Sequence, residues 1–240
     1  MEANPPLAGT AALITGASRG IGFAIAERLG QLGARIAICA RDASALEDAR
    51  ARLHSSGIDV FAMPADVSSS QQVSSLVEKT AAHFGAIDFL VNNAGTSTFG
   101  PVHERSEQEW DTVLDTNLKG VFLASRAVIP GMISRRRGHI VNISSLAGKN
   151  SFAGGSLYCA SKWGLLGLTY CMAEDLRAYG IRVTSICPGS VATDFGHPPS
   201  GKDRRKMLQP ADVAHAVEMV LTAEPQSFIS EVLLRPTQKP

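Results

Sequence analysis

The chain carries almost no net charge and has no long apolar run, and both shortages narrow its possible functions. Lysine and arginine total 23 against 22 aspartate and glutamate residues, which gives a formal net charge of +1. This balance provides no overall attraction to nucleic acid or to an acidic membrane surface. No apolar run is long enough to cross a bilayer, and the first residues lack the pattern of a signal peptide. We therefore expect a soluble, cytoplasmic protein that binds neither nucleic acid nor membrane.

Cysteine and histidine are few and scattered. The four cysteines and six histidines show no spacing typical of a zinc site. Cys39 and Cys187 lie in apolar, strand-like runs, where a reduced and buried thiol is the expected state. The sequence therefore predicts no metal ligands.

Short apolar runs alternate with helical patterns along the 240 residues, of which 45% are hydrophobic. Strands are predicted at 10–15, 35–40, 59–63, 87–91, 139–143, 181–187 and 228–234. Helices are predicted at 21–32, 44–57, 69–84, 106–133, 156–179 and 210–222. This alternation predicts an α/β fold: a single Rossmann-type domain over 1–240, with a doubly wound parallel sheet of about seven strands and helices on both faces. The polar segment 194–209 is predicted to be a substrate loop or lid.

Local signals predict where some helices begin and break. Ser44-x-x-Glu47 and Ser106-x-x-Glu109 both have the pattern of a capping box. Pro130 falls inside the predicted helix 106–133 and is expected to break it.

A glycine-rich turn follows the first predicted strand and opens a helix. Gly16 permits a sharp turn, whereas Gly20 and Gly22 let the backbone approach a phosphate and let the helix pack on the sheet. The helix N-terminus then offers free N–H groups to a pyrophosphate. A plain strand-to-helix turn is the alternative, but the flanking strand and helix favour dinucleotide binding.

The end of the second predicted strand bears on which dinucleotide binds. A free ribose 2′-hydroxyl is usually bound by an acidic residue here, whereas a 2′-phosphate needs a cation. The sequence provides Arg41, and Arg19 in the glycine turn lies near it in the chain topology. Asp42 argues for the other cofactor, and we interpret it as leading into the helix at Ser44. NADP(H) is therefore favoured, with NAD(H) as the alternative.

Tyr158 and Lys162 lie four residues apart in the predicted helix 156–179, so they share one helical face. A nearby ammonium favours the phenolate and lowers the pKa of a tyrosine, whose ordinary value is about 10. The pair is therefore a candidate acid/base. Taken alone, it is more often a core tyrosine and a solvated lysine.

Further motifs follow the predicted strands in order and decide between these alternatives. They are Thr15–Gly22, Asp66-Val67, Asn92-Asn93-Ala94-Gly95, Asn117, Ser145 thirteen residues before Tyr158, and Pro188–Thr193. With them, nearly the whole chain resembles the short-chain dehydrogenase/reductase family, including its 3-oxoacyl-acyl-carrier-protein reductases and related NADP-dependent carbonyl reductases.

The resemblance implies hydride transfer between a nicotinamide and a carbonyl or secondary alcohol. Tyr158 would act as the general acid/base, and Lys162 would lower its pKa and bind the nicotinamide ribose. Ser145 would orient the substrate, and Asn117 would hold a water that links Lys162 to solvent. The implied cofactor contacts are Gly16, Ser18, Arg19, Gly20, Ile21, Gly22, Arg41, Asp66, Val67, Asn93, Ala94, Gly95, Tyr158, Lys162, Pro188, Gly189, Val191 and Thr193.

The sequence does not identify the substrate. Phe99, Phe195 and the patch 152–155 would border its pocket in this family, although each fits ordinary packing equally well. Arg136, in a run of three arginines, matches a position that meets an acidic acyl carrier protein, but a basic run is usually a solvated face, so this partner is not favoured. A non-catalytic dinucleotide sensor is a further alternative. The resemblance also implies a homodimer or homotetramer that pairs through the regions 112–129 and 156–179.

Overall fold

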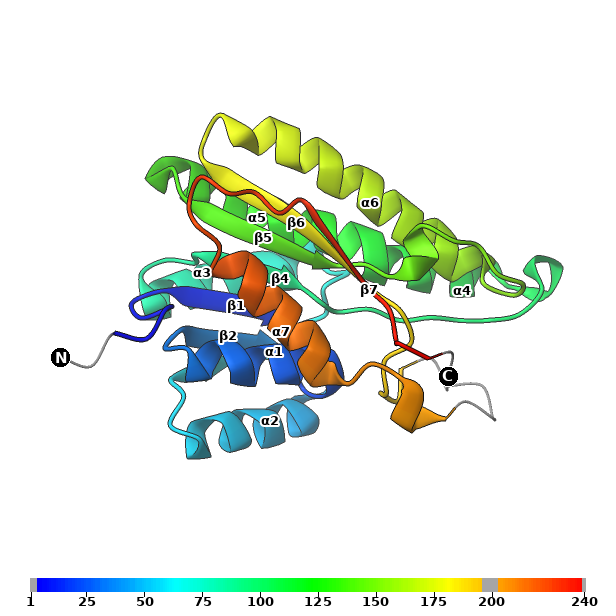
Figure 1. The fold of residues 1–240 in the computed structure, drawn as a ribbon, viewed down its shortest axis with the longest axis horizontal. Coiled ribbons are helices and arrows are strands. Elements are labelled where there is room, and N and C mark those ends of the chain that lie inside the picture. The colour runs from blue at the N-terminus through cyan, green and yellow to red at the C-terminus, as the bar shows by residue number, and fades with distance from the viewer. Residues whose placement is uncertain (1–3, 196–202, 239–240) are drawn as a thin grey trace.

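A computed structural model describes residues 4–195 and 203–238 of the chain (Figure 1). Its seven strands form one sheet in the order β3-β2-β1-β4-β5-β6-β7, and all neighbouring strands are parallel. The strands are β1 (Ala11–Thr15), β2 (Arg35–Cys39), β3 (Val60–Ala62), β4 (Phe89–Asn92), β5 (Gly138–Ile143), β6 (Ile181–Pro188) and β7 (Glu231–Leu234). The predicted doubly wound parallel sheet is confirmed.

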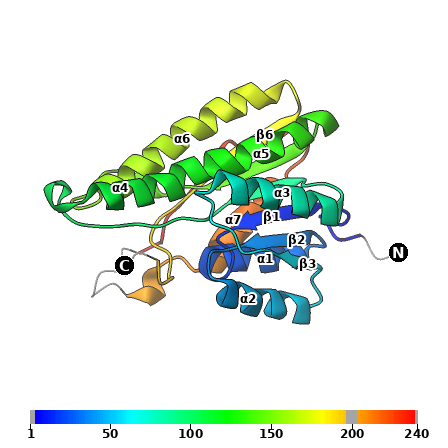
Figure 2. The same ribbon diagram turned by 180° about the vertical axis from the view of Figure 1, so that it is seen from behind.

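Helices cover both faces of the sheet, as the two opposite views show (Figures 1 and 2). One face carries α1 (Gly20–Gln31), α2 (Ala43–Ser55) and α7 (Pro210–Leu221), and the other carries α3 (Ser70–Phe84), α5 (Gly120–Arg135) and α6 (Ser156–Arg177). Neighbouring strand residues pack into opposite core layers: Ile14 joins the first and Leu13 the second. Because both faces are covered, β1 is buried at all five positions and reads as one apolar run.

The order of the strands creates a crevice at the carboxyl edge of the sheet. β1 pairs with β2 on one side and with β4 on the other, so the chain reverses its direction of progress across the sheet at β1. The turns that leave β1 and β4 therefore diverge at this edge, which is where doubly wound sheets bind ligands.

The start of α2 differs from the predicted capping box. Asp42 is the N-cap, and its carboxylate accepts a hydrogen bond from the Ala45 amide at 3.1 Å. Glu47 instead pairs with Arg50 at 2.6 Å. The prediction of a cap at Ser44 is wrong, because an aspartate two residues earlier caps the same helix equally well. The capping box of Ser106 and Glu109 is confirmed at the start of α4 (Glu107–Leu114).

The predicted break at Pro130 is also wrong. Pro130 lies inside α5, which continues to Arg135. The irregularity occurs earlier, where a π-helical turn, η2 (Asp115–Lys119), joins α4 to α5. Such a turn contains one extra residue, and such bulges are frequent at functional sites. Here it directs the fully buried Asn117 to partners on two other segments, so the local irregularity serves a tertiary contact.

Candidate active site

A cleft of roughly 1530 Å³ opens at the carboxyl edge of the sheet. Its walls come from the segments that follow each of β1 to β7, together with the start of α6. The cleft brings together the glycine turn, Arg41, Tyr158 and Lys162, which the sequence had placed on separate segments.

The glycine turn is shaped by close approach of the backbone. Gly16 has a φ of +65°, and a Cβ there would lie 2.7 Å from the Cα of Ala94. A Cβ on Gly22 would lie 2.5 Å from Nδ2 of Asn93. The N-cap residue Arg19 makes no capping hydrogen bond with its side chain, so the first N–H groups of α1 can bind an anion. A phosphate cradle that side chains would fill and an uncapped helix start both fit the pyrophosphate of a dinucleotide.

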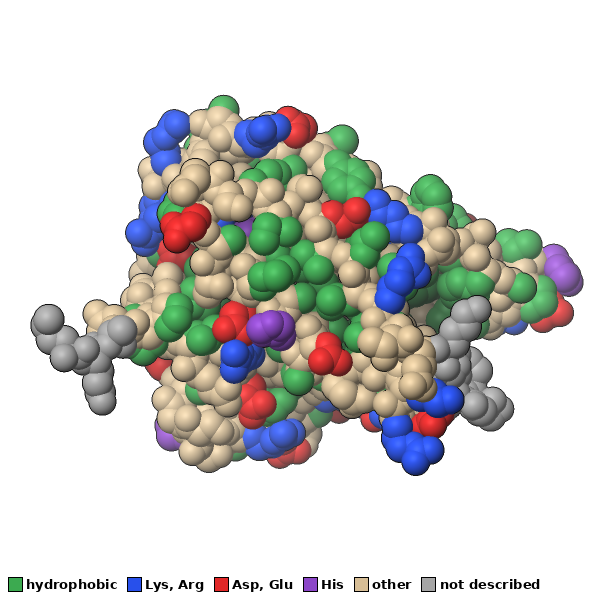
Figure 3. All heavy atoms as spheres, in the orientation of Figure 1, with side chains coloured by type: hydrophobic (Ala, Val, Ile, Leu, Met, Phe, Trp, Pro, Cys, Tyr) green, Lys and Arg blue, Asp and Glu red, His purple; other side chains and the backbone are tan. Residues whose placement is uncertain are grey.

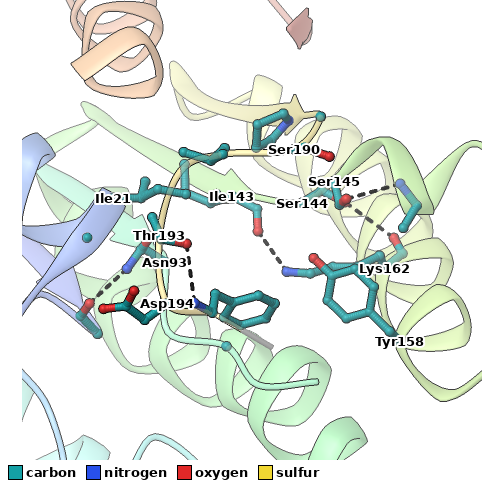
Figure 4. Close-up of a pocket in the computed structure, with 18 of the residues that line it drawn as sticks. Ile21, Asn93, Ile143, Ser144, Ser145, Tyr158, Lys162, Ser190, Thr193 and Asp194 are labelled. Carbon is teal, nitrogen blue, oxygen red and sulfur yellow. Dashed lines mark hydrogen bonds between the residues drawn. The ribbon is translucent and has the colours of Figure 1, made fainter. Parts of the chain in front are cut away.

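Asn93 holds this turn from the next strand end. Its Nδ2 donates hydrogen bonds to the carbonyl oxygens of Thr15 at 3.0 Å and Gly16 at 2.9 Å. In return, the Thr15 hydroxyl accepts from the amides of Asn93 and Ala94, each at 3.1 Å. The turns after β1 and β4 are thus bonded to each other, and the Asn93 side chain points to the protein backbone (Figure 4).

The part of the cleft near the end of β2 carries both positively and negatively charged side chains. Arg41 is exposed and lines the cleft together with Arg19. Asp66 also lines it, and although partial burial opposes the shift, hydrogen bonds from Ser68 and the nearby charge of Arg41 hold the pKa of Asp66 below its usual value. Asp42 is occupied as the cap of α2. Arg41 is therefore the side chain on this wall suited to a 2′-phosphate.

Tyr158 and Lys162 lie on the first turns of α6 and face the cleft, as their i, i+4 spacing predicted (Figure 4). The Lys162 side chain is buried, and its Nζ donates to the Ile143 carbonyl at 2.9 Å. Nζ lies 5.8 Å from the centre of the Tyr158 ring. Burial lowers the pKa of Lys162 to about 8 and raises the pKa of Tyr158 to about 12, against an opposing effect of the Ser145 hydroxyl. Burial is the largest effect on the Tyr158 pKa here, and Lys162 is not among the groups that shift it.

Two adjacent serines follow β5, and their surroundings differ. The Ser145 hydroxyl interacts with Tyr158 and accepts from the Ala147 amide at 3.0 Å. The Ser144 hydroxyl is buried and faces the Lys162 carbonyl oxygen at 3.5 Å. Of the two, Ser145 is the hydroxyl placed to meet a substrate oxygen beside Tyr158.

Asn117 uses its whole side chain to join segments of the protein. Its Oδ1 accepts from the Thr96 amide at 2.8 Å, while Nδ2 donates to the Thr96 carbonyl at 2.8 Å and to the Ser161 hydroxyl at 3.0 Å. Asn117 therefore fixes the loop after β4 to α6, one residue from Lys162. Its amide has no free donor, so this side chain positions the site.

The segment after β6 closes the cleft opposite the glycine turn. The Gly189 amide donates to the Leu234 carbonyl at 2.9 Å, and Val191 pairs with Leu208 in an isolated parallel bridge. Thr193 faces Gly20, where an added Cβ would lie 3.4 Å from the threonine methyl group. The bridge ties together the two ends of the predicted loop 194–209, of which residues 196–202 lie outside the described residues.

Sequence reasoning missed the contribution of the C-terminus to the cleft. Residues 235–238 line it after β7. Pro236 packs on Gly189, where a Cβ would lie 3.1 Å from its Cδ. No local pattern in residues 235–238 placed this segment at the cleft, because its position depends on the pairing of β7 with β6.

Among residues 4–195 and 203–238, no group of three or more His, Cys, Asp or Glu side chains is arranged to hold a metal ion. None of the helices in this described part of the chain is long and apolar enough to span a membrane.

Comparisons with known proteins agree with this geometry. A family model described as short chain dehydrogenase matches residues 10–203. A solved metagenomic short-chain oxidoreductase in complex with NADP is 44% identical, with a TM-score of 0.87 over 98% of this chain and 100% of the other. The 3-oxoacyl-acyl-carrier-protein reductase of Staphylococcus aureus is 37% identical over 86% of this chain and 88% of its own length. The glycine betaine reductase ATRR of Emericella nidulans is 34% identical over 98% of this chain, which spans only 19% of that longer protein.

Proposed function

Because the chain belongs to the short-chain dehydrogenase family, we propose that it transfers hydride between NADP(H) and a carbonyl or secondary alcohol substrate. The observation that carries the proposal is the meeting of Tyr158, Lys162 and Ser145 with the glycine turn in one cleft. A nucleotide site without chemistry needs the turn alone, whereas this cleft also holds a phenol, an ammonium and a hydroxyl on a single wall.

The dinucleotide would lie along the edge of the sheet, held at the positions inferred from the sequence. The turn from Gly16 through Ser18 to Gly22 would bind the pyrophosphate, while Asp66, Val67, Ala94 and Gly95 would border the adenosine half. Lys162, Pro188, Gly189, Val191 and Thr193 would border the nicotinamide half. NADP(H), when bound, supplies or accepts the hydride. Asn93 would act mainly by holding the turn, given its bonds to Thr15 and Gly16.

Arg41 and Arg19 support NADP(H) as the preferred cofactor, with NAD(H) as the alternative. Both guanidinium groups line the cleft, and the one acid that argued for NAD, Asp42, is occupied as a helix cap. The NADP complex of the 44% identical relative is consistent with this preference.

Tyr158 would donate the proton and Ser145 would hold the substrate oxygen beside it. In reduction, the carbonyl carbon would gain a hydride supplied by NADPH and its oxygen would gain the phenolic proton, so a ketone would become a secondary alcohol. Burial raises the pKa of Tyr158 to about 12, so the phenol carries its proton at neutral pH. Burial lowers the pKa of Lys162 to about 8, close enough to neutrality for proton resupply.

The test is the variant Tyr158→Phe, assayed by NADPH oxidation at the reduced-nicotinamide absorbance with ketones, aldehydes, quinones and β-ketoacyl thioesters. General acid–base groups contribute about 10²- to 10⁴-fold, so turnover should fall by that factor while NADPH affinity changes little. Tyr179→Phe is the matched control, since Tyr179 does not line the cleft. Near-normal turnover in Tyr158→Phe would show that the acid lies elsewhere. NADPH binding with no turnover of any carbonyl in the native protein would indicate a dinucleotide sensor.

Reduction of 3-oxoacyl thioesters on an acyl carrier protein is the second candidate, favoured by the Staphylococcus aureus relative. Arg136, which matches a carrier-binding position of the family, and its two neighbouring arginines all have partners within the chain. Arg135 donates to the Ile87 carbonyl at 2.7 Å, Arg136 donates to the Ala178 carbonyl at 2.8 Å, and Arg137 pairs with Asp88 at 3.2 Å. Titration with an acyl carrier protein at low salt tests this candidate. Without saturable, salt-sensitive binding it is removed.

We also infer that the chain acts as one nucleotide-binding domain, with 194–209 as its substrate loop, and that it assembles as a homodimer or homotetramer. The large exposed side chains Trp110, Phe122 and Trp163 support the assembly, because they lie on α4, α5 and α6. A small apolar groove between η2, α5 and α6 lies on the same side. Light scattering on the purified protein gives the oligomeric state. The four cysteines are free, as expected for a cytoplasmic protein.

A further inference from the structure

Three exposed phenylalanines from three different loops meet at the catalytic end of the cleft. Phe99 follows β4, Phe152 follows the short helix η3 (Leu146–Gly148), and Phe195 follows β6. Their exposed fractions are 42%, 49% and 43%. In Figure 1, the segments that precede α4 and α6 form a projection at the right of the molecule. Figure 3, in the same orientation, shows hydrophobic side chains gathered on this projection. A gathering of exposed apolar side chains usually marks a binding surface.

Two of the rings, Phe99 and Phe195, lie beside Tyr158, and Phe152 packs against Phe99, all at distances typical of aromatic pairs. Phe99 lies 5.9 Å from Phe152 and 5.9 Å from Tyr158, measured between ring centres, and Phe195 lies 5.9 Å from Tyr158. The interplanar angles run from 52° to 74°, so the rings are tilted or edge-on to one another. The rings leave part of their surfaces open toward the cleft, where a further ring would find both faces and edges to contact.

The backbone holds two of these rings in place before any substrate arrives. The Phe152 ring lies against Gly155, where a Cβ would come within 2.5 Å of it. The Gly100 amide donates to the Gly154 carbonyl at 2.9 Å, so the loops that carry Phe99 and Phe152 are bonded to each other. Because the loops that carry these two rings are bonded to each other, a ligand would lose less binding free energy in ordering them.

Arg105 supports the same loop from behind. Its Nη1 donates to the Phe99 carbonyl at 3.4 Å, and it pairs with Glu109 on α4 at 3.1 Å. Beside Phe195, Asp194 and Arg204 pair with each other at 3.3 Å. These charges are thus directed to partners within the protein, and the side chains that pack on the Tyr158 ring include Phe99 and Phe195.

We propose that the substrate carries an aromatic ring next to its carbonyl group, as an aryl ketone or aryl aldehyde does, or as the matching benzylic alcohol does in the reverse reaction. The proposal rests on the proposed function, since it assigns the substrate of the same site. Phe99, Phe152 and Phe195 contact the aromatic ring, while Tyr158 and Ser145 contact the carbonyl oxygen. A saturated ring of equal carbon number buries similar area but lacks the flat face and the polar edge that these three rings match.

The experiment compares acetophenone with cyclohexyl methyl ketone, two ketones with the same carbon skeleton. The quantity is the ratio of their kcat/KM values, measured in the native enzyme and in Phe99→Leu, Phe152→Leu and Phe195→Leu. Leucine keeps an apolar side chain, and comparing variants cancels the different reactivity of the two ketones. Each substitution should lower the ratio by about two- to tenfold, the usual contribution of one aromatic pair. The control Phe61→Leu, on the edge strand β3 and outside the cleft, should leave it unchanged.

A second measurement does not depend on turnover. Calorimetry on Tyr158→Phe with NADP⁺ present should show 1-phenylethanol binding at least threefold more tightly than 1-cyclohexylethanol, and Phe152→Leu should remove the difference. Ratios that stay constant in the three cleft variants, or equal binding of the two alcohols, would overturn the aromatic assignment. Neither result would touch the proposed function, which fails only if no carbonyl in the wider panel supports NADPH oxidation.

Discussion

Substitution of Asn93 tests how the glycine turn is held, because sequence and structure give this residue different roles. Family resemblance makes it a cofactor contact. In the structure, its Nδ2 donates to the Thr15 and Gly16 carbonyls at 3.0 and 2.9 Å. The variant Asn93→Ala removes both bonds and keeps the backbone amide that donates to the Thr15 hydroxyl. We therefore expect a loss of folding stability even without cofactor.

The magnitude follows from the burial of the two acceptors. A hydrogen bond contributes about 1 kcal/mol net, and more when a buried partner is left unpaired. Asn93 is only half-buried, so water can replace part of the loss, and the two bonds together should be worth about 2 kcal/mol. Cofactor binding can reorder a loosened turn at that same cost. NADPH should therefore bind more weakly by at most about 30-fold, the factor equivalent to 2 kcal/mol.

The assay is denaturant unfolding of Asn93→Ala without cofactor, followed by NADPH titration by calorimetry. Ser18→Ala is the matched control, because Ser18 lines the cleft but makes no hydrogen bond to any other described residue. It should weaken NADPH binding and leave the unfolding free energy within about 0.5 kcal/mol of the native value. The reasoning is refuted if Asn93→Ala behaves in the same way, with weaker NADPH binding and unchanged stability.

Three other variants test separate parts of the molecule. Arg41→Ala should raise the KM for NADPH about tenfold and leave the KM for NADH nearly unchanged, because an exposed charge-assisted bond is worth about 1.4 kcal/mol, and equal effects on both would exclude a 2′-phosphate contact. Ser145→Ala should lower kcat about 10²-fold, as removal of an oxyanion donor does, while Ser144→Ala keeps most activity; the reverse order would exchange their roles. Burial lowers the pKa of His139 to about 3, so its unfolded form binds a proton first and native stability falls as pH drops from about 6.5 toward 3. The His139 contribution to this loss is about 1.4 kcal/mol of unfolding free energy per pH unit, and His139→Gln should remove it. Urea unfolding at pH 7, 6 and 5 measures the loss, and an equally steep loss in the variant would exclude His139 as its cause.

Much of the fold follows from local patterns in the chain, and the convergence of its motifs follows from topology. Each strand of a parallel sheet ends at the same edge, so residues placed just after strands must meet there. Gly16 after β1, Asn93 after β4 and Gly189 after β6 needed no further information to be brought together. The catalytic pair needed only the spacing of a helix.

What the sequence did not reveal depends on tertiary contacts that carry no local signal. The π-helical turn at Asn117 exists because an inward-facing amide finds partners at Thr96 and Ser161, and both lie outside its own helix. Asp42 and Ser44 are equally good N-caps in composition, and the geometry of the turn after β2 selects Asp42. The meeting of Phe99, Phe152 and Phe195 could not be predicted either, because they lie on three separate loops. The conformation of these loops depends on glycines and on contacts such as the backbone hydrogen bond between Gly100 and Gly154.

The chemistry of Tyr158 and Lys162 shows how far spacing alone can mislead. Because Lys162 lies one helical turn from Tyr158, its ammonium was expected to lower the pKa of the phenol. Burial instead raises the pKa of Tyr158 to about 12 and lowers that of Lys162 to about 8. The Lys162 ammonium donates a hydrogen bond to the Ile143 carbonyl. Spacing brings the groups together, but the dielectric of the wall decides which form each prefers. A phenol that holds its proton at neutral pH can donate it to a carbonyl oxygen, and the phenolate so formed can take a proton from an alcohol in the reverse reaction.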